Sequence, residues 1–112
     1  MPVPRMVHGA SELARELGGW PSFEDAEVID VSLRREGESV IGIQLADPPR
    51  TVVEFVLTDV YGLTLEQFND QNAIAGLGVE SDEDLLQIRL APRHGLSGFI
   101  QAKRARVRVR PA

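Results

Sequence analysis

Short stretches in which hydrophobic and polar residues alternate recur along the chain, and this period of two is typical of β-strands that bury one face. The alternation predicts five strands, whose buried faces carry Ile29, Val31 and Leu33; Ile41, Ile43 and Leu45; Val53, Phe55 and Leu57; Leu77 and Val79; and Leu86, Ile88 and Leu90. In the third strand the opposite face is also hydrophobic, which predicts a central strand covered on both sides, with Val52, Val56 and Val60 on that second face. Turn-forming residues separate these strands at 35–38, 47–50, 81–84 and 92–95.

The last strand carries two hydrophobic sets, one at even and one at odd positions: Ile100 and Ala102, then Ala105, Val107 and Val109. A straight strand cannot bury both sets on one face. We therefore expect a β-bulge near Lys103 and Arg104, or a bend that carries the strand between two environments.

Helical spacing occurs near the N-terminus, at Ala10, Leu13, Ala14 and Leu17. Ser11 is a fair N-cap, and Gly18 and Gly19 end the pattern, so a helix is predicted over 10–18. Residues 1–9 are expected to be a loosely ordered lead-in. The chain is thus predicted to be a single domain, 1–112, of the α+β class and mainly β. A short N-terminal helix accompanies an antiparallel meander of about six strands over 26–110.

Three aromatic residues are expected to anchor the fold: Trp20, Phe23 and Phe68. Pro21 biases Trp20 toward extended geometry, so the Trp20–Phe23 turn is predicted to wedge onto the core. Phe68 lies in the least regular segment, 63–80, where its spacing from Leu65 suits one helical turn.

Composition narrows the class of protein. Of the 112 residues 43% are hydrophobic and 26% are charged, which is typical of a globular domain. The absence of cysteine excludes disulfides and thiol catalysis. No apolar run approaches the roughly 20 residues of a membrane span, and the N-terminus lacks the apolar core of a signal peptide. We therefore expect a cytoplasmic protein that does not contact membranes.

The charge is unevenly distributed. Five of the twelve cations lie near the C-terminus, at Lys103, Arg104, Arg106, Arg108 and Arg110. The rest of the chain carries seven cations against seventeen anions, or 7 − 17 = −10. Such a body favours basic partners and repels nucleic acid. The four arginines at even positions share one face of a strand, over about 20 Å. They would contact phosphates or an acidic partner, or form a solvated face paired with carboxylates of the adjacent strand.

Two polar clusters are candidate partner-binding sites. The first is acidic and comprises Glu24, Asp25 and Glu27. It is a contact patch, a general acid–base pair, or simply the solvated start of a strand. The second contains side-chain amides, at Asn69, Gln71 and Asn72, and is either a recognition loop or a set of amides that satisfy the local backbone. His8 and His94 show no metal-ligand spacing, so no metal or other cofactor is expected.

Several short motifs are similar to those of a known family: Gly19-Trp20-Pro21-Ser22-Phe23, Asp25-Ala26-Glu27-Val28, Phe68-Asn69 with Gln71-Asn72, and Gly95-Leu96 with Gly98 before the Arg-Val alternation. Together they resemble immunity protein 50, a family of bacterial polymorphic toxin systems. The resemblance covers most of the chain and implies an intracellular protein that binds and neutralises a cognate toxin. Glu24 stands where the family pattern has a histidine, so Asp25 and Glu27 are the matching polar positions.

Three hypotheses follow. The first is a binding module without enzymatic activity, an immunity protein that occludes a toxin. The second is a carboxylate-dependent hydrolase, for which the sequence offers no nucleophile–base pair. The third is a nucleic-acid contact protein that uses the arginine strand, which the acidic body opposes.

Overall fold

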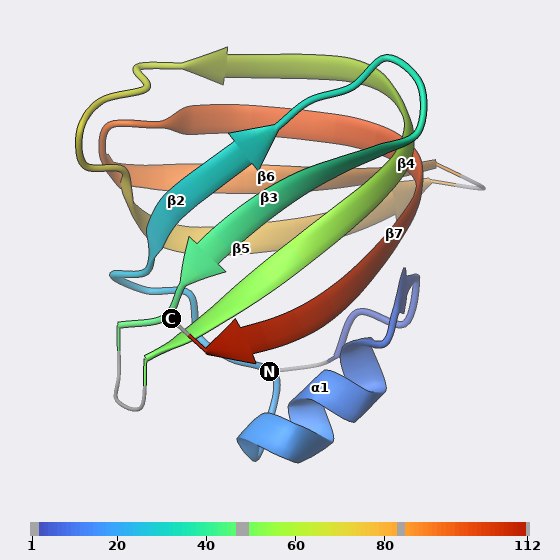
Figure 1. Ribbon diagram of the computed structural model, residues 1–112, viewed down its shortest axis with the longest axis vertical. Coiled ribbons are helices and arrows are strands. Elements are labelled where there is room, and N and C mark those ends of the chain that lie inside the picture. The colour runs from blue at the N-terminus through green and yellow to red at the C-terminus, as the bar shows by residue number, and fades with distance from the viewer. Residues whose placement is uncertain (1–2, 47–49, 83–84, 112) are drawn as a thin grey trace.

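The computed structural model describes residues 3–46, 50–82 and 85–111 (Figure 1). It contains one short helix and seven strands, which confirms the α+β, mainly β class. In chain order the elements are β1 (Val7–His8), α1 (Ala10–Leu17), β2 (Glu27–Ser32), β3 (Glu38–Gln44), β4 (Thr51–Glu66), β5 (Ala73–Asp82), β6 (Leu85–His94) and β7 (Ser97–Pro111). Most of the expected turn at 47–50 and half of that at 81–84 lie outside the described residues, and Ser81 and Asp82 belong to β5.

All seven strands belong to one sheet, in the order β1-β7-β4-β3-β2-β5-β6, and β6 also pairs with β7. Strands β2 to β7 therefore form a closed ring, in which every pairing is antiparallel. β1 joins β7 in parallel. The expected meander holds within β2-β3-β4 and within β5-β6-β7. The chain departs from it between β4 and β5, because the second half of β4 pairs with β7 and β5 returns to β2.

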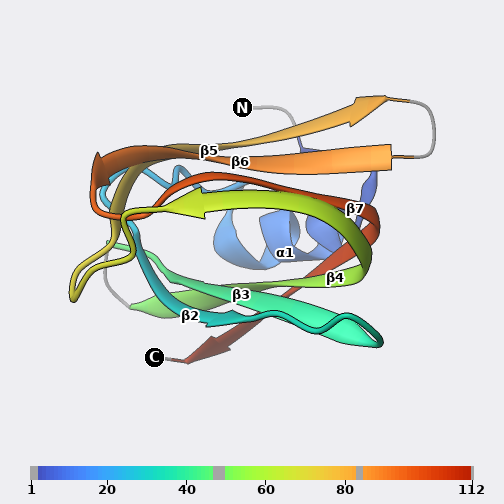
Figure 2. The ribbon, with the colours of Figure 1, turned by 90° about the horizontal axis from the view of Figure 1, so that it is seen from above.

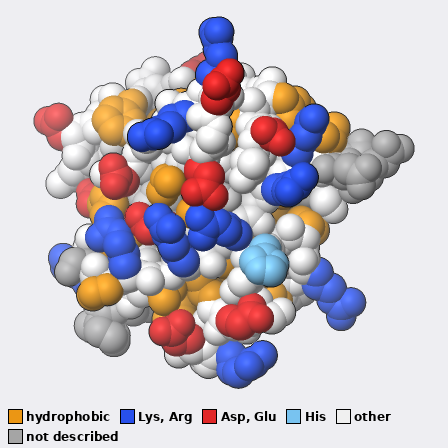
Figure 3. Space-filling view, turned by 45° about the vertical axis from the view of Figure 1, so that its right-hand side comes forward, with side chains coloured by type: hydrophobic (Ala, Val, Ile, Leu, Met, Phe, Trp, Pro, Cys, Tyr) orange, Lys and Arg blue, Asp and Glu red, His pale blue; other side chains and the backbone are white. Residues whose placement is uncertain are grey.

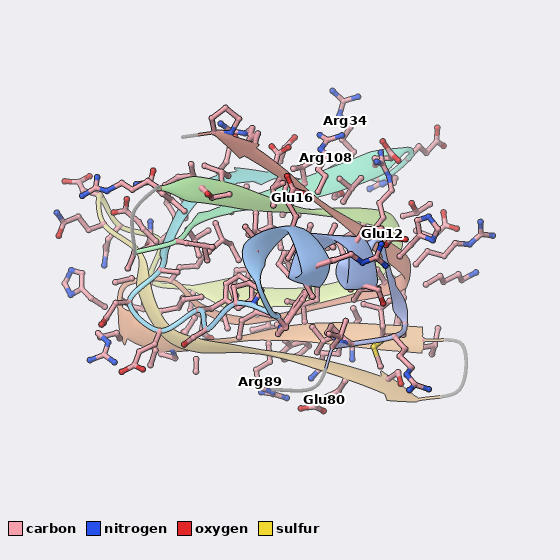
Figure 4. All side chains as sticks on the ribbon, turned by 90° about the horizontal axis from the view of Figure 1, so that it is seen from below. Glu12, Glu16, Arg34, Glu80, Arg89 and Arg108 are labelled. Atoms are coloured by element: carbon pink, nitrogen blue, oxygen red, sulfur yellow. The ribbon has the colours of Figure 1, made fainter. Side chains whose placement is uncertain are left out.

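The closed sheet has two layers, and β4 and β7 bend from one layer into the other (Figure 2). α1 lies at one end, between the layers (Figure 4). The expected bend in β7 is confirmed, since Ala102 and Ala105 are both buried while Lys103 and Arg104 are exposed. The shift in register lies on the partner strand, between Val60 and Gly62, and not in β7.

The core fills the space between the layers and includes an aromatic cluster of Trp20, Phe23 and Phe55. The ring centroids of Trp20 lie 5.8 Å from Phe23 and 6.3 Å from Phe55, in edge-on contact. Burial of Trp20 and Phe23 confirms two of the three expected anchors. The third is wrong: Phe68 is 64% exposed, because β4 continues through Glu66 and leaves Phe68 in the loop that follows.

The N-terminal region is more ordered than expected. Val7 is buried and β1 pairs with β7, so residues 7 and 8 belong to the sheet. α1 begins after Gly9, which has a left-handed backbone, and not after Ser11. It ends at Leu17, one residue before the predicted end, and Gly18 is its C-cap. No helix in the described part of the chain is long and apolar enough to cross a membrane.

The hydrophobic alternation is correct in β3 and in the first half of β4, where Val52 and Val56 are buried on the second face. In β2 it is wrong for Ile29, which is 39% exposed because the register shifts between Val28 and Asp30 and turns Val28 inward. Val31 is half-buried against the core as expected, whereas Leu33 is 43% exposed and lies beyond the end of β2. The turn expected at 92–95 is shorter, because β6 continues through His94.

Candidate functional site

Three connections meet at one end of the closed sheet: residues 22–26 before β2, 67–72 between β4 and β5, and 95–96 between β6 and β7. We call this surface the loop end; it lies on the left in Figures 1 and 2. Strand register brings the connections together, because Ala73 pairs with both Glu27 and His94. The two candidate clusters, distant in sequence, are therefore neighbours in the fold.

Backbone hydrogen bonds fix the acidic connection against the start of β5. The Asp25 N–H donates to the Ile74 carbonyl, and the Ile74 N–H donates to the Ala26 carbonyl, both over 2.9 Å. Asp25 itself has a left-handed backbone, with φ 63°. This tight turn places the carboxylates of Glu24 and Asp25 at the surface, where both are exposed.

Arg93 of β6 binds both of these carboxylates. Its Nε lies 2.8 Å from Oδ1 of Asp25, and its Nη2 lies 3.5 Å from Oε1 of Glu24. Glu27 is half-buried in β2 and makes no ion pair among the described residues. Sequence reasoning missed Arg93. Neighbouring carboxylates repel one another unless they are solvated, protonated or matched by a cation, and the sequence alone does not indicate which of these applies.

Asn72 is buried, and its side chain holds the 67–72 connection in place. Its Oδ1 accepts from the N–H groups of Asn69, over 2.9 Å, and Leu96, over 3.0 Å. Its Nδ2 donates to the Asn69 carbonyl over 2.8 Å. The prediction that Asn72 contacts a partner is therefore wrong, because its hydrogen-bonding groups serve the backbone. Asn69 and Gln71 are exposed and stay candidates.

Asn72→Ala should lower the free energy of unfolding by about 2 to 3 kcal/mol, because the N–H groups of Asn69 and Leu96 lose their acceptor, one of them buried. Urea titration measures this loss. Asn69→Ala is the matched control, with an expected change below about 0.5 kcal/mol because its side chain is exposed. Equal losses in the two variants would contradict the structural role of Asn72.

The fixed connection presents Phe68 to solvent. Beside it is an open hollow of about 660 Å³, lined by Phe68, Asn69, Asp70, Gln71 and His94. A second hollow, of about 710 Å³, includes Glu16, Trp20, Glu24 and Asp25 in its lining. The loop end thus combines an exposed aromatic ring with an acidic surface.

The arginine row, which comprises Arg104, Arg106, Arg108 and Arg110, lies on the outer face of β7, and two carboxylates bind three of its members. Arg108 and Arg110 bind the two carboxylate oxygens of Glu54, with Nε to oxygen distances of 2.8 and 3.2 Å. Arg106 binds Glu38 at 3.0 Å. Figure 3 shows Lys and Arg side chains, in blue, intermixed with Asp and Glu side chains, in red, on one face of the molecule. Pairing with carboxylates of the adjacent strand, one of the interpretations of the row, therefore applies to Arg108 and Arg110, which bind Glu54 of β4, whereas Glu38 belongs to β3, one strand further away.

Glu54 is nearly buried, with a side chain 11% exposed. Burial raises the pKa of its carboxyl, but hydrogen bonds from Arg108 and Arg110 and their charge outweigh it, so the pKa falls below its ordinary value of 4.5. The charged carboxylate therefore stabilises the folded state above about pH 4.5, and that stabilisation is lost as the pH falls through the folded-state pKa.

Glu54→Gln should lower the free energy of unfolding by about 1 to 2 kcal/mol at pH 7, since two charge-assisted hydrogen bonds weaken. Wild type should lose this advantage progressively below about pH 4.5. Urea midpoints of both proteins from pH 7 to pH 3 measure it. A difference that stays constant over this range would refute the role of the Glu54 charge.

Among the residues that the structure describes, no three of His, Cys, Asp or Glu are grouped so as to hold a metal ion. Comparison with models of protein families, with curated proteins and with solved structures finds no match to this chain.

Proposed function

We propose that this protein is a cytoplasmic binding protein of the immunity type, which neutralises a cognate toxin by direct contact through the loop end. The observation that supports the proposal is the convergence at the loop end. Phe68 and the Glu24–Asp25 pair come from separate parts of the chain, yet strand register and the buried Asn72 hold them on one surface.

Phe68 is the expected anchor of the contact. Large aromatic side chains dominate the energetics of protein interfaces when they enter a pocket of the partner. The ring is 64% exposed in the free protein, so its burial by a partner would remove much apolar area from water. Because Asn72 already orders the backbone of this loop, binding loses little conformational entropy.

The excess of negative charge at the loop end favours a basic partner. Glu24, Asp25 and Asp70 outnumber Arg93 at the loop end, and the rest of the body is acidic as well. This field attracts a basic surface and speeds its association. The arrangement suits a cationic toxin surface, such as one that itself attacks nucleic acid.

The other two hypotheses receive less support. The salt bridges from Arg93 to both Glu24 and Asp25 favour a surface role for these carboxylates over acid–base catalysis. Glu54 and Glu38 pair with three arginines of the row and offset two of its four positive charges, which weakens its attraction for a phosphate backbone.

The test requires a toxin domain encoded in a reading frame next to the gene for this protein, co-expressed with it to score protection. Binding kinetics of the purified pair then locate the interface. Phe68→Ala should weaken binding at least about 30-fold, or about 2 kcal/mol. The double variant Glu24→Ala, Asp25→Ala should lower mainly the association rate, and less so at high salt.

Two matched controls lie at the opposite end of the sheet. Leu85→Ala removes an apolar side chain that is 40% exposed, and Glu36→Ala removes an exposed carboxylate in the β2–β3 turn. Both should leave affinity and protection unchanged. Full protection by the Phe68 and acidic variants together would refute the loop end as the binding site.

A further inference from the structure

The positive charge of the arginine row is compensated at one end and not at the other. Arg108 and Arg110 share Glu54. In contrast, Lys103 and Arg104 make no ion pair within 4.0 Å among the described residues, and both are exposed. The uncompensated charge therefore concentrates at the bend of β7.

A hollow of about 420 Å³ lies at this bend, lined by Met6, His8, Thr58, Lys103, Arg104, Ala105 and Arg106. Register explains the grouping. His8 of β1 pairs with Arg106, and Thr58 of β4 pairs with Arg104, so both side chains share the outer face with the arginines. No carboxylate of the described residues lines the hollow.

We propose that this hollow is a binding site for a phosphate dianion, either free phosphate or the terminal group of a phosphomonoester. Three cations line it, and Glu38 offsets one of them through Arg106, which leaves a surplus of 3 − 1 = +2. A phosphate with a free end carries about −1.5 to −2 at pH 7 and matches this surplus, whereas a carboxylate does not. The guanidinium forks, the Lys103 ammonium and the Thr58 hydroxyl provide donors for its oxygens.

The surroundings of the other arginines in the row favour a single phosphate group over a polynucleotide as the ligand. A phosphate backbone needs a continuous positive track. Glu54 interrupts this one, and Arg108 shares another hollow, of about 370 Å³, with Glu12 and Glu16 of α1 (Figure 4). A nucleic-acid strand bound along β7 would therefore meet carboxylates beyond Arg106.

This site goes beyond the proposed toxin contact and is separate from it. The bend of β7 lies on the right in Figure 1, across the molecule from the loop end. Loss of phosphate binding and loss of toxin binding are thus distinguishable by which set of substitutions causes each.

The experiment is a titration of the isotope-labelled protein with inorganic phosphate, followed by NMR at constant ionic strength and pH 7.5. Saturable shifts confined to the amides of His8, Thr58 and residues 103–106 are expected. Arg104→Gln and, separately, Lys103→Gln should each weaken binding at least about tenfold. Arg35→Gln, which removes an exposed cation from the β2–β3 turn, is the matched control and should not weaken it. Because Lys103 and Arg104 are exposed, both variants should keep the wild-type thermal midpoint.

A further variant, which removes a negative charge, should strengthen phosphate binding where the loss of a cation weakens it. Asp59 is exposed and lies between Thr58 and Val60, which pair with Arg104 and Ala102, so Asp59→Asn should tighten phosphate binding about two- to threefold. Parallel titrations with phenyl phosphate distinguish the two sources of the group, since tighter binding of the ester assigns the site to a phosphomonoester. Absence of saturation, equal weakening by Arg35→Gln, or tighter binding of a single-stranded oligonucleotide that depends on Arg108 would each overturn the proposal.

Discussion

Trp20→Ala should lower the free energy of unfolding by about 3 to 5 kcal/mol, because the core cannot refill the space of an indole ring. Only 9% of Trp20 is exposed, and its ring contacts both Phe23 and Phe55. The residue also joins the end of α1 to the core of the closed sheet. Its removal therefore weakens two attachments at once, that of the helix and that of the acidic connection.

Urea unfolding followed by circular dichroism measures this loss. Phe68→Ala is the matched control, since it also removes an aromatic ring, but one that is 64% exposed, and its expected change is below about 0.5 kcal/mol. An unchanged urea midpoint for Trp20→Ala would show that the turn does not anchor the fold.

Gly98→Ala should destabilise the protein by about 3 kcal/mol or more, through backbone strain and overlap together. Gly98 has φ 131°, in the region that favours glycine. A Cβ at this position would overlap the carbonyl oxygen of Thr64. Since Gly98 pairs with Leu65 on one side and Leu90 on the other, neither neighbour can withdraw without breaking a strand pairing.

Gly78→Ala is the control for this prediction. Gly78 also lies within a strand, but a Cβ there meets nothing within 4 Å and the backbone is not left-handed. Its substitution should leave stability unchanged or raise it by about 0.5 kcal/mol. Thermal midpoints of the two variants measure the contrast, and a loss of similar size in both would contradict the close approach of β4 and β7 at Gly98.

The sequence predicts the parts of the fold whose burial follows from local period. Ile41, Ile43 and Phe55 are buried as their alternation indicates, because the pairing of β3 with β4 that contains them has a regular register. Ile29 is exposed because a shift in register interrupts the alternation of β2. Such a shift depends on the partner strand, so alternation within β2 alone cannot reveal it.

The sequence likewise predicts only part of the candidate site at the loop end. Sequence motifs identified Asp25 and Asn69, which the fold brings to one surface. They did not separate Asn69, which is exposed, from Asn72, which is buried, because both are amides in one short segment. Arg93 escaped prediction because its contact with Asp25 depends on the pairing of β5 with both β2 and β6.

The strand pairings that close the sheet differ greatly in length. β4 and β7 pair from Thr51–Pro111 to Glu66–Ser97, whereas in the described residues β2 meets β5 at one strand pair, Glu27 with Ala73, and three nearby backbone hydrogen bonds. Local opening is easiest where the fewest hydrogen bonds must break. Amide hydrogen exchange with solvent should therefore be fastest where β2 pairs with β5, directly beneath the loop end. A partner that contacts both β2 and β5 would slow that exchange, so that binding at the loop end would also stabilise the closed sheet.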